Sequence, residues 1–198
     1  MDGLTAGFKS MVPACTVLTL AWTLKGVCDA LSVGPYVSDV VSSSSVPIAI
    51  LPAIVFVVAA FLSFSTGTAW GTFGILISIV VPICENVDIS ILSIMLAATL
   101  AGSVFGDHCS PISDTTILSS TGAGCDHITH VSTQIPYALL VAGCCFAGYI
   151  VAGLTRNVFI TLAFSVALLV GALFLLHKFT LKKESAAAKA ELARRGEG

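Results

Sequence analysis

Charged residues are scarce in this chain. Asp, Glu, Lys and Arg make up 10% of its 198 residues, hydrophobic residues make up 56%, and the mean hydropathy is +0.99. Because about a quarter of the residues in a soluble domain are charged, this composition excludes an ordinary water-soluble protein. The formal net charge of −2 gives no electrostatic reason for nucleic-acid binding. We therefore predict a membrane protein with the lipid bilayer as a partner and with no nucleic-acid partner.

Several functional signatures are also missing. The first ten residues, MDGLTAGFKS, lack the apolar core and cleavage site of a secretory signal, so we expect no removed segment. The seven cysteines form no CxxC pair, which leaves a disulfide framework or a zinc ribbon without support. There is no nucleophile elbow, phosphate-binding loop or dinucleotide fingerprint. We expect neither a resident cofactor nor enzymatic activity.

Long apolar runs fill most of the chain. A membrane-spanning helix needs about 20 apolar residues. Runs of this kind occupy residues 11–31, 47–64, 89–105, 136–154 and 158–176. They predict an all-α fold, namely a polytopic bundle of transmembrane helices. We expect a transmembrane domain over residues 1–177 and a cytoplasmic charged tail over residues 178–198.

The charged residues near the end of the chain predict its orientation in the cell membrane. The positive-inside rule places the carboxyl terminus in the cytoplasm, because three lysines follow the last apolar run. They are Lys178, Lys182 and Lys183. Residues 155–157 are enough for a tight turn between the last two spans. Counting back, the turn at Arg156 faces outward and the loop over residues 125–130 faces the cytoplasm.

A first polar stretch interrupts the apolar runs at residues 63–74. Five Ser or Thr and three Gly fall within these twelve positions, and residues 47–84 are too many for one span. Irregular backbone at membrane depth is stable only where protein or a water-filled cavity satisfies its polar groups. We therefore predict a broken helix that faces inward. The alternative is an ordinary loop between two spans.

A second polar stretch runs from Gly106 to Thr116. A carboxylate at the bilayer centre costs about 2.5–3.5 kcal/mol, so Asp107 and Asp114 should face a cavity, a partner or an ion. Gly106 and Pro111 predict a helix break between them. The hydroxyls in this stretch belong to Ser110, Ser113, Thr115 and Thr116. Because small hard cations such as sodium prefer oxygen ligands, we predict a site where sodium and a proton compete for the carboxylates.

Each of these residues also has a structural interpretation. Asp114 could cap a helix that begins at Thr115, and Asp107 could lie at the membrane surface. His108 is either a second proton-active group or a residue that fixes a loop by hydrogen bonding.

A cluster of His and Asp follows at residues 125–130. We place Asp126, His127 and His130 in a loop, with Gly122 and Gly124 making its turn. No HExxH motif and no fourth ligand at a recognisable spacing accompanies them, so the signal for a metal site is weak. A membrane metalloenzyme that uses these three residues with Asp107 and His108 is kept as an alternative.

Three segments resemble a known family. They are LTLAW at residues 18–22, FSTGTAWGTFG at residues 64–74 and FGDHCSPISDTTILSSTGAGCDHITHVSTQIPYA at residues 105–138. Together they resemble the NhaC family of sodium/proton antiporters, and the last match is long and specific. The resemblance implies one half of an inverted-repeat secondary transporter with interrupted helices. It implies exchange of sodium for protons, and some relatives exchange malate for lactate with coupled ions.

The resemblance also suggests site residues and partners. It favours Asp107 and Asp114 as ion- and proton-binding residues, with the four hydroxyls and His108, and it adds lining residues from the first polar stretch. These are Ser65, Thr66 and Thr68. Family members are more than twice as long, so this chain resembles their carboxyl-terminal part. It is then a fragment, a truncated product or one piece of a split transporter, which would need an upstream half or a homo-oligomer.

Overall fold

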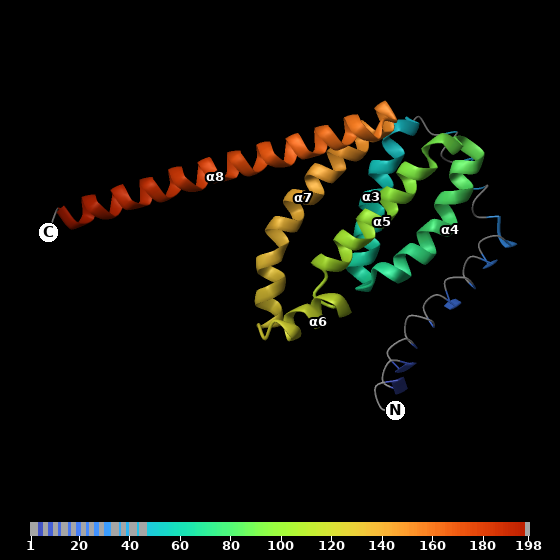
Figure 1. Ribbon diagram of the computed structural model, residues 1–198, viewed down its shortest axis with the longest axis horizontal. Coiled ribbons are helices and arrows are strands. Elements are labelled where there is room, and N and C mark those ends of the chain that lie inside the picture. Colours follow the sequence, from blue (N-terminus) through green and yellow to red (C-terminus); the bar gives the residue numbers. More distant parts are fainter. Residues whose placement is uncertain are drawn as a thin grey trace.

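The computed structural model describes residues 47–196 continuously, together with scattered positions between residues 4 and 43; side chains are described as far as residue 178, except for Asn86. The predicted span at residues 11–31 falls largely outside the described residues. Throughout residues 47–196 every regular element is a helix (Figure 1). The elements are η1 (Ile48–Ile50), α3 (Leu51–Thr66), α4 (Ala69–Val87), η2 (Ile89–Ile91), α5 (Leu92–Cys109), α6 (Asp114–Gly122), α7 (His127–Thr155) and α8 (Val158–Gly196). The all-α prediction is confirmed.

Four of these segments are long and apolar enough to cross a membrane. They are Ile48–Thr66, Ile89–Cys109, His127–Thr155 and Val158–Lys178. At 1.5 Å per residue, a span of about 20 residues is about 30 Å long, which matches the hydrocarbon core of a bilayer. α4 contains a shorter apolar segment, Ala69–Glu85. The chain is therefore a polytopic helical membrane protein, as its composition predicts.

Helices α3 and α5 pack closely and run in the same direction. A Cβ atom on Gly102 would lie 2.9 Å from the Ala59 Cβ, and one on Gly106 would overlap the Ala60 carbonyl oxygen. Because both glycines lack a side chain, the two backbones can approach each other at these points. The small residues of the predicted 89–105 span thus bring the end of α5 beside the end of α3.

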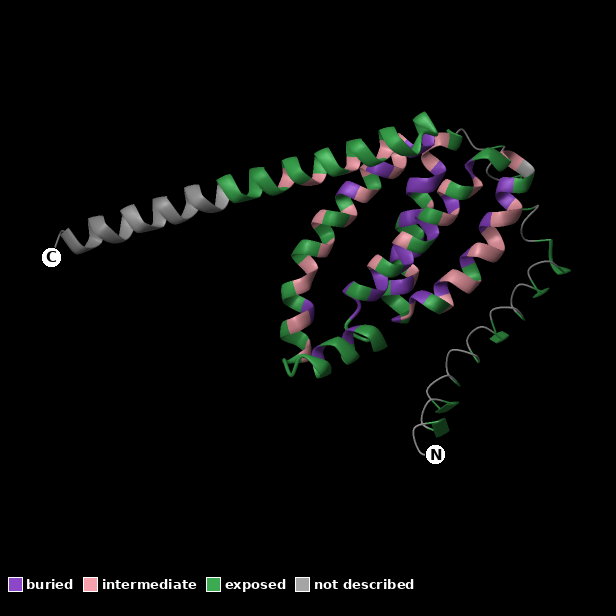
Figure 2. Ribbon diagram, in the orientation of Figure 1, coloured by how far each residue is buried: buried purple, intermediate pink, exposed green. Residues whose placement is uncertain are grey.

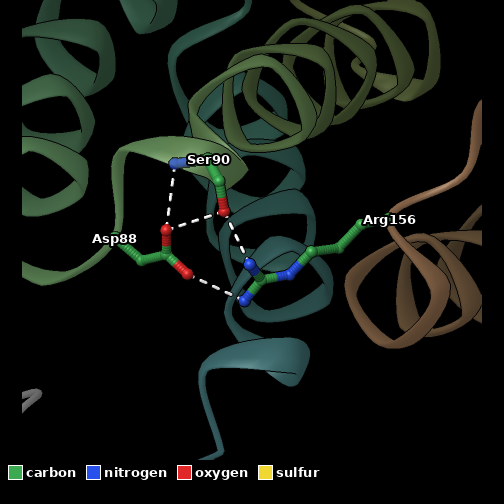
Figure 3. Close-up of polar contacts among 3 residues, drawn as sticks. All are labelled: Asp88, Ser90 and Arg156. Carbon is green, nitrogen blue, oxygen red and sulfur yellow. Dashed lines mark hydrogen bonds and ion pairs between the residues drawn. The ribbon is translucent and has the colours of Figure 1, made fainter.

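One end of the bundle is closed by an ion pair between two turns (Figure 3). Arg156, in the turn between α7 and α8, places Nη2 2.7 Å from Asp88 Oδ2 and donates from Nη1 to Ser90 Oγ at 2.6 Å. Ser90 in turn donates its hydroxyl to Asp88 Oδ1 at 2.7 Å. Arg156 adopts the left-handed conformation, with φ of 51°, which reverses the chain. The predicted tight turn at residues 155–157 is confirmed.

The apolar core and the buried polar groups occupy different parts of the bundle. The apolar core lies near the Asp88–Arg156 end, where the start of α3, the end of α4 and the start of α5 meet. Its members are Leu51, Val80, Cys84, Ile91 and Met95. The buried residues of α5 include the hydroxyls of Thr99 and Ser103, followed by Asp107. The opposite end of the bundle therefore carries a polar interior.

Helix α8 projects away from the other helices (Figure 1). It begins beside the Arg156 turn and continues through Gly196 as one helix of 39 residues. Up to residue 178 it is largely exposed (Figure 2), and Phe159 at its start is 83% exposed. Its apolar segment therefore offers a surface to lipid or to another membrane segment. No helix break marks the predicted boundary at residues 177–178, so that boundary stays a prediction from composition.

Candidate functional site

The first polar stretch forms a tight reversal between α3 and α4. Gly67 ends α3 in the left-handed conformation, with φ of 67°, and donates its N–H to the Ser63 carbonyl oxygen at 2.8 Å. Thr68 is extended, and α4 begins at Ala69. The sequence predicts a broken helix, with a loop between two helices as the alternative; the structure shows the alternative, a turn of only two residues between helices that run in opposite directions. We call Gly67 and Thr68 the first break.

The second polar stretch separates α5 from α6. The helix ends at Cys109, Ser110 is extended, and α6 begins at Asp114. The predicted interruption between Asp107 and Asp114 is therefore present. The N-cap of α6 is Ser113, whose hydroxyl accepts the Thr116 N–H at 3.4 Å, and not Asp114 as the structural alternative proposed. We call residues 110–113 the second break.

The two breaks touch each other. A Cβ atom on Gly67 would lie 2.9 Å from both the Cγ1 atom and the carbonyl oxygen of Ile112. Gly106 lies against the Phe64 backbone just before this contact. The ends of α3 and α5 and the start of α6 therefore meet at one place in the bundle.

Asp107 is buried at this meeting point and is held by hydroxyls of the next helix. Asp107 is only 4% exposed. Ser113 Oγ lies 2.8 Å from Asp107 Oδ1, and Thr115 Oγ1 lies 2.7 Å from Asp107 Oδ2. The two hydroxyl oxygens are themselves 2.8 Å apart. The carboxyl group and the two hydroxyls thus form a closed ring of three contacts.

The sequence around Asp107 offers no permanent cation to neutralise it. From residue 26 to residue 155 the chain contains no Lys or Arg. The same stretch contains Asp29, Asp39, Glu85, Asp88, Asp107, Asp114 and Asp126. The next basic residue, Arg156, pairs with Asp88 at the opposite end of the bundle. Among the described residues no Lys or Arg pairs with Asp107, and a buried carboxylate without such a partner is costly.

The other predicted residues of the second polar stretch differ in burial. Ser110, Ser113 and Thr116 are buried, and Thr116 Oγ1 lies 3.5 Å from the His108 carbonyl oxygen. Asp114 is exposed in the first turn of α6, where its carboxylate accepts the Thr115 N–H at 2.8 Å. The His108 side chain is exposed and lines an apolar cavity of about 730 Å³ between α5 and α7. The structure therefore brings Asp107 together with the hydroxyls and leaves His108 to one side.

Among the residues of the first polar stretch, burial selects a different set from the predicted one. Ser65 and Thr66 are exposed and donate their hydroxyls to carbonyl oxygens of their own helix, at 2.8 and 2.9 Å. Thr68 is half-buried. By contrast, Ser63 is fully buried, and its Oγ has no hydrogen-bond partner among the described residues.

Ser63 faces the interior close to the second break. It lies on α3 three residues after Ala60, which contacts Gly106, and four residues before Gly67, which contacts Ile112. These spacings place Ser63 on the same face of α3 as Ala60, directed toward the Gly67 cap. Sequence reasoning missed Ser63 because it sits in the same Ser/Thr-rich stretch as its exposed neighbours, and only packing separates them.

The residues after the second break cap and support α7. Asp126 is the N-cap of α7 and accepts the Thr129 N–H at 2.8 Å, and the hydrogen bonds from Thr129 lower the pKa of its carboxyl group. His127 and His130 lie in the first turn of α7, which corrects their placement in a loop. Gly124 has φ of 64° and makes the turn before α7, as predicted, but Gly122, which was predicted to share that turn, is the last residue of α6. Among the described residues, no three His, Cys, Asp or Glu side chains gather as a metal-binding group.

The apolar bundle, the touching breaks and the buried carboxyl group define a polytopic membrane protein with a polar site inside it. Residues 1–154 match the Na+/H+ antiporter family, and this chain belongs to that family. The predicted resemblance to sodium/proton antiporters is confirmed at this level. No solved structure matches the chain.

Three relatives show how much of a family member the chain represents. It is 50% identical to an uncharacterized protein of Haemophilus influenzae over 76% of this chain and 29% of the relative. It is 33% identical to an uncharacterized Na(+)/H(+) antiporter of the same organism, over 70% and 32%. It is 30% identical to the malate-2H(+)/Na(+)-lactate antiporter of Bacillus subtilis, over 57% and 26%. The chain therefore spans less than a third of the length of each relative.

Proposed function

We propose that this chain is the part of a secondary active transporter that exchanges sodium for protons at Asp107. Membership of the Na+/H+ antiporter family supports an antiporter. The structural support comes from Asp107, which is buried at touching helix breaks and pairs with no cation among the described residues. Membership of the NhaC subfamily and sodium as the coupled ion are parts of this proposal.

The ring of contacts around Asp107 carries the proposal. It has three oxygen–oxygen contacts of 2.7 to 2.8 Å, between Asp107 and Ser113, Ser113 and Thr115, and Thr115 and Asp107. The two hydroxyls supply only two protons, and a carboxylate supplies none. All three contacts become hydrogen bonds only when Asp107 is protonated and donates to one of the two hydroxyls, either that of Thr115 or that of Ser113. Once Asp107 is ionised, one contact lacks a proton, and the converging oxygens can bind a cation instead.

This proton count makes binding of the two substrates mutually exclusive. A proton on Asp107 closes the ring and neutralises the buried charge, and a sodium ion at the oxygens neutralises it from outside the ring. The other oxygens near the second break are the buried hydroxyls of Ser110 and Thr116. Asp114, exposed at the start of α6, adds a second carboxylate beside Thr115. Exchange follows because either substrate must leave before the other binds.

Asp107→Asn tests this assignment with a sharp expectation. The side-chain amide can donate to Thr115 and accept from Ser113, so it closes the ring as the protonated acid does. We expect thermal stability equal to or above that of the wild type, together with a loss of sodium-dependent proton flux of at least about 100-fold, because electrostatic groups at such sites contribute on this scale. Asp114→Asn should retain flux with a weaker apparent sodium affinity.

The flux measurement needs the protein that contains this chain. Membrane vesicles are prepared from cells that express the chain with the genomic sequence that precedes it, and sodium-driven pH changes are followed with a fluorescent dye. Undiminished exchange in the Asp107→Asn, Asp114→Asn double variant would reject the site. We also propose that an upstream half or a second copy of the chain provides the rest of the transporter.

A second candidate is an organic-anion exchanger coupled to sodium and protons. The observation that favours it is the 30% identity to a malate-2H(+)/Na(+)-lactate antiporter. The Asp107 ring serves this reaction too, because its sodium and proton steps are the same. Uptake of labelled malate or lactate by the same vesicles, with no sodium/proton exchange in the absence of organic anion, selects this candidate.

We also propose that the carboxyl terminus is cytoplasmic and that the two breaks face the cytoplasm. Lys178, Lys182 and Lys183 support the first statement. α7 then crosses the membrane from the break end to an outward-facing Arg156 turn. Cys125 is exposed next to the breaks and is a natural probe of this orientation. A membrane-impermeant maleimide should label it in everted vesicles and not in intact cells.

A further inference from the structure

Helix α6, which carries the hydroxyls that contact Asp107, has little apolar anchoring of its own. Its buried residues are Thr116 and Ser120, both small and polar. Its larger apolar side chains point outward, since Ile117 is 44% and Leu118 is 70% exposed. A helix of nine residues is too short to be stable by itself. The position of α6 therefore depends on a few polar contacts.

The polar contacts of α6 come from two directions. At its first turn, Ser113 and Thr115 contact Asp107 of α5. At the start of α7, His127 makes contacts at both ends of α6. Its Nε2 lies 2.7 Å from the Pro111 carbonyl oxygen, ahead of the helix, and its Nδ1 lies 3.1 Å from Ser120 Oγ in the last turn. One imidazole ring therefore bridges the two ends of α6.

The hydrogen-bond partners of His127 determine which of its ring nitrogens carries the proton. A carbonyl oxygen only accepts, so Nε2 carries the proton and donates to Pro111. Nδ1 then faces the Ser120 hydroxyl, which also lies 2.9 Å from the Ile117 carbonyl oxygen within α6. Pro111 lies in the second break, between Ser110 and Ser113. The bond from His127 therefore holds the irregular backbone of this break. The contact is set by tertiary structure, since 16 residues separate His127 from Pro111.

We propose that His127 is a positioning residue, which holds α6 against α5 so that Ser113 and Thr115 stay in contact with Asp107. The inference rests on the proposed function for its effect on transport, but the contact itself can be tested without transport. The ring nitrogens of His127 contact Ser120 and Pro111 and not Asp107. It acts through the backbone of the second break and through the last turn of α6.

Two amide substitutions separate the two contacts of His127. In His127→Gln the amide nitrogen can occupy the place of Nε2 and still donate to Pro111. In His127→Asn the amide reaches only the place of Nδ1, near Ser120. His127→Ala removes both contacts. His130→Ala is the matched control, because His130 lies in the same first turn of α7 and its side chain makes no hydrogen bond among the described residues.

Hydrogen–deuterium exchange of α6 is the direct readout. The full chain is placed in lipid nanodiscs, and exchange is followed in peptides that cover residues 111–122. Loss of a hydrogen bond shifts a local opening equilibrium by about tenfold, so His127→Ala should speed α6 exchange about tenfold, with exchange in α3 and α5 unchanged. His127→Gln should restore slow exchange, His127→Asn should not, and His130→Ala should match the wild type.

The outcomes separate this inference from the proposed function. Wild-type exchange of α6 in His127→Ala overturns the positioning role, and so does equal exchange in the Gln and Ala variants. Where flux is measurable, His127→Ala should raise the sodium concentration at half-maximal flux about tenfold, with partial rescue in His127→Gln. If α6 loosens as expected while no variant and no wild-type protein exchanges sodium for protons, the positioning contact stands and the proposed function falls.

Discussion

Gly67 and Ile112 lie in direct contact, so that the end of α3 and the start of α6 meet although 45 residues separate them in the sequence. Gly67 belongs to the first break and Ile112 to the second. The absence of a Cβ atom on Gly67 is what lets the Ile112 carbonyl group approach. This contact turns two separate polar stretches into one site, with Asp107 beside it.

The contact can be tested with two glycines of similar backbone conformation. Gly67 has φ of 67° and is blocked by Ile112, whereas Gly124 has φ of 64° and has open space around its missing side chain. Alanine at a left-handed position costs about 1–2 kcal/mol. We expect Gly67→Ala to lower the free energy of unfolding by more than this, and Gly124→Ala by about this amount. Thermal unfolding in detergent measures both, and equal losses would contradict the contact.

Ser63 offers a prediction in which stability and function move in opposite directions. Its buried hydroxyl lacks a partner among the described residues, so Ser63→Ala should leave stability unchanged or raise it by about 1 kcal/mol. If this oxygen completes the sodium site, the same change should weaken apparent sodium affinity several-fold. Ser65→Ala is the control, because that exposed hydroxyl bonds to the Phe61 carbonyl oxygen. A sodium dependence identical to that of the wild type would remove Ser63 from the site.

The approach of α3 to α5 depends on Gly106. Its missing Cβ atom would overlap the Ala60 carbonyl oxygen, so Gly106→Ala must push the two helices apart, at a cost of about 1–3 kcal/mol or more. Gly143 in α7 has open space around its missing Cβ atom, and Gly143→Ala should be neutral or stabilising by up to about 1 kcal/mol. Chemical denaturation of both variants tests this. Similar stabilities for the two would show that α3 and α5 are not closely packed here.

The stability that the Asp88–Arg156 ion pair contributes at the other end of the bundle should depend on pH. Hydrogen bonds from Ser90, and then Arg156, lower the pKa of the Asp88 carboxyl group. A lowered pKa in the folded state means that Asp88 stabilises the fold when ionised. Its contribution is complete above the unfolded value of about 3.9 and disappears as the pH falls through the lower folded value.

Thermal unfolding at a series of pH values tests this assignment. The difference in Tm between the wild type and Asp88→Asn should be constant from about pH 7 to pH 5 and should shrink below about pH 4. Ser90→Ala should weaken this acid dependence more than Arg156→Gln, because the bond from the Ser90 hydroxyl is the largest single cause, and the backbone N–H bond of residue 90 remains in both variants. A Tm difference that does not vary between pH 7 and pH 3 would argue against the role of Asp88.

Much of the fold could be predicted because lipid imposes strong local rules. Apolar runs of about 20 residues must be helices in a bilayer, and this rule anticipated α3, α5, α7 and the first part of α8. The turn at Arg156 and the interruption near Pro111 followed from short polar segments and from proline. The element boundaries were less predictable. α7 begins at His127, nine residues before the predicted 136–154 span, because Asp126 caps a polar first turn.

The candidate site was predicted only in part, for a physical reason. Charge cost alone singles out Asp107, since an acidic residue after an apolar run needs a partner or an ion. The same rule treats Asp114 as its equal, although one is buried and the other exposed. Hydroxyl side chains carry even less information, because Ser and Thr in helices also bond to their own backbone, as Ser65 does.

The amino-acid sequence by itself determined that this protein lies in a membrane, that it is helical, and that Asp107 has no Lys or Arg near it in the chain. These properties follow from composition and from local backbone rules. Only the tertiary structure decided which hydroxyls surround the carboxyl group, that Ser63 is buried beside the breaks, and that His127 bridges α6. Those relationships depend on the close approach of α3 to α5 and of Gly67 to Ile112, which is a property of packing between distant segments.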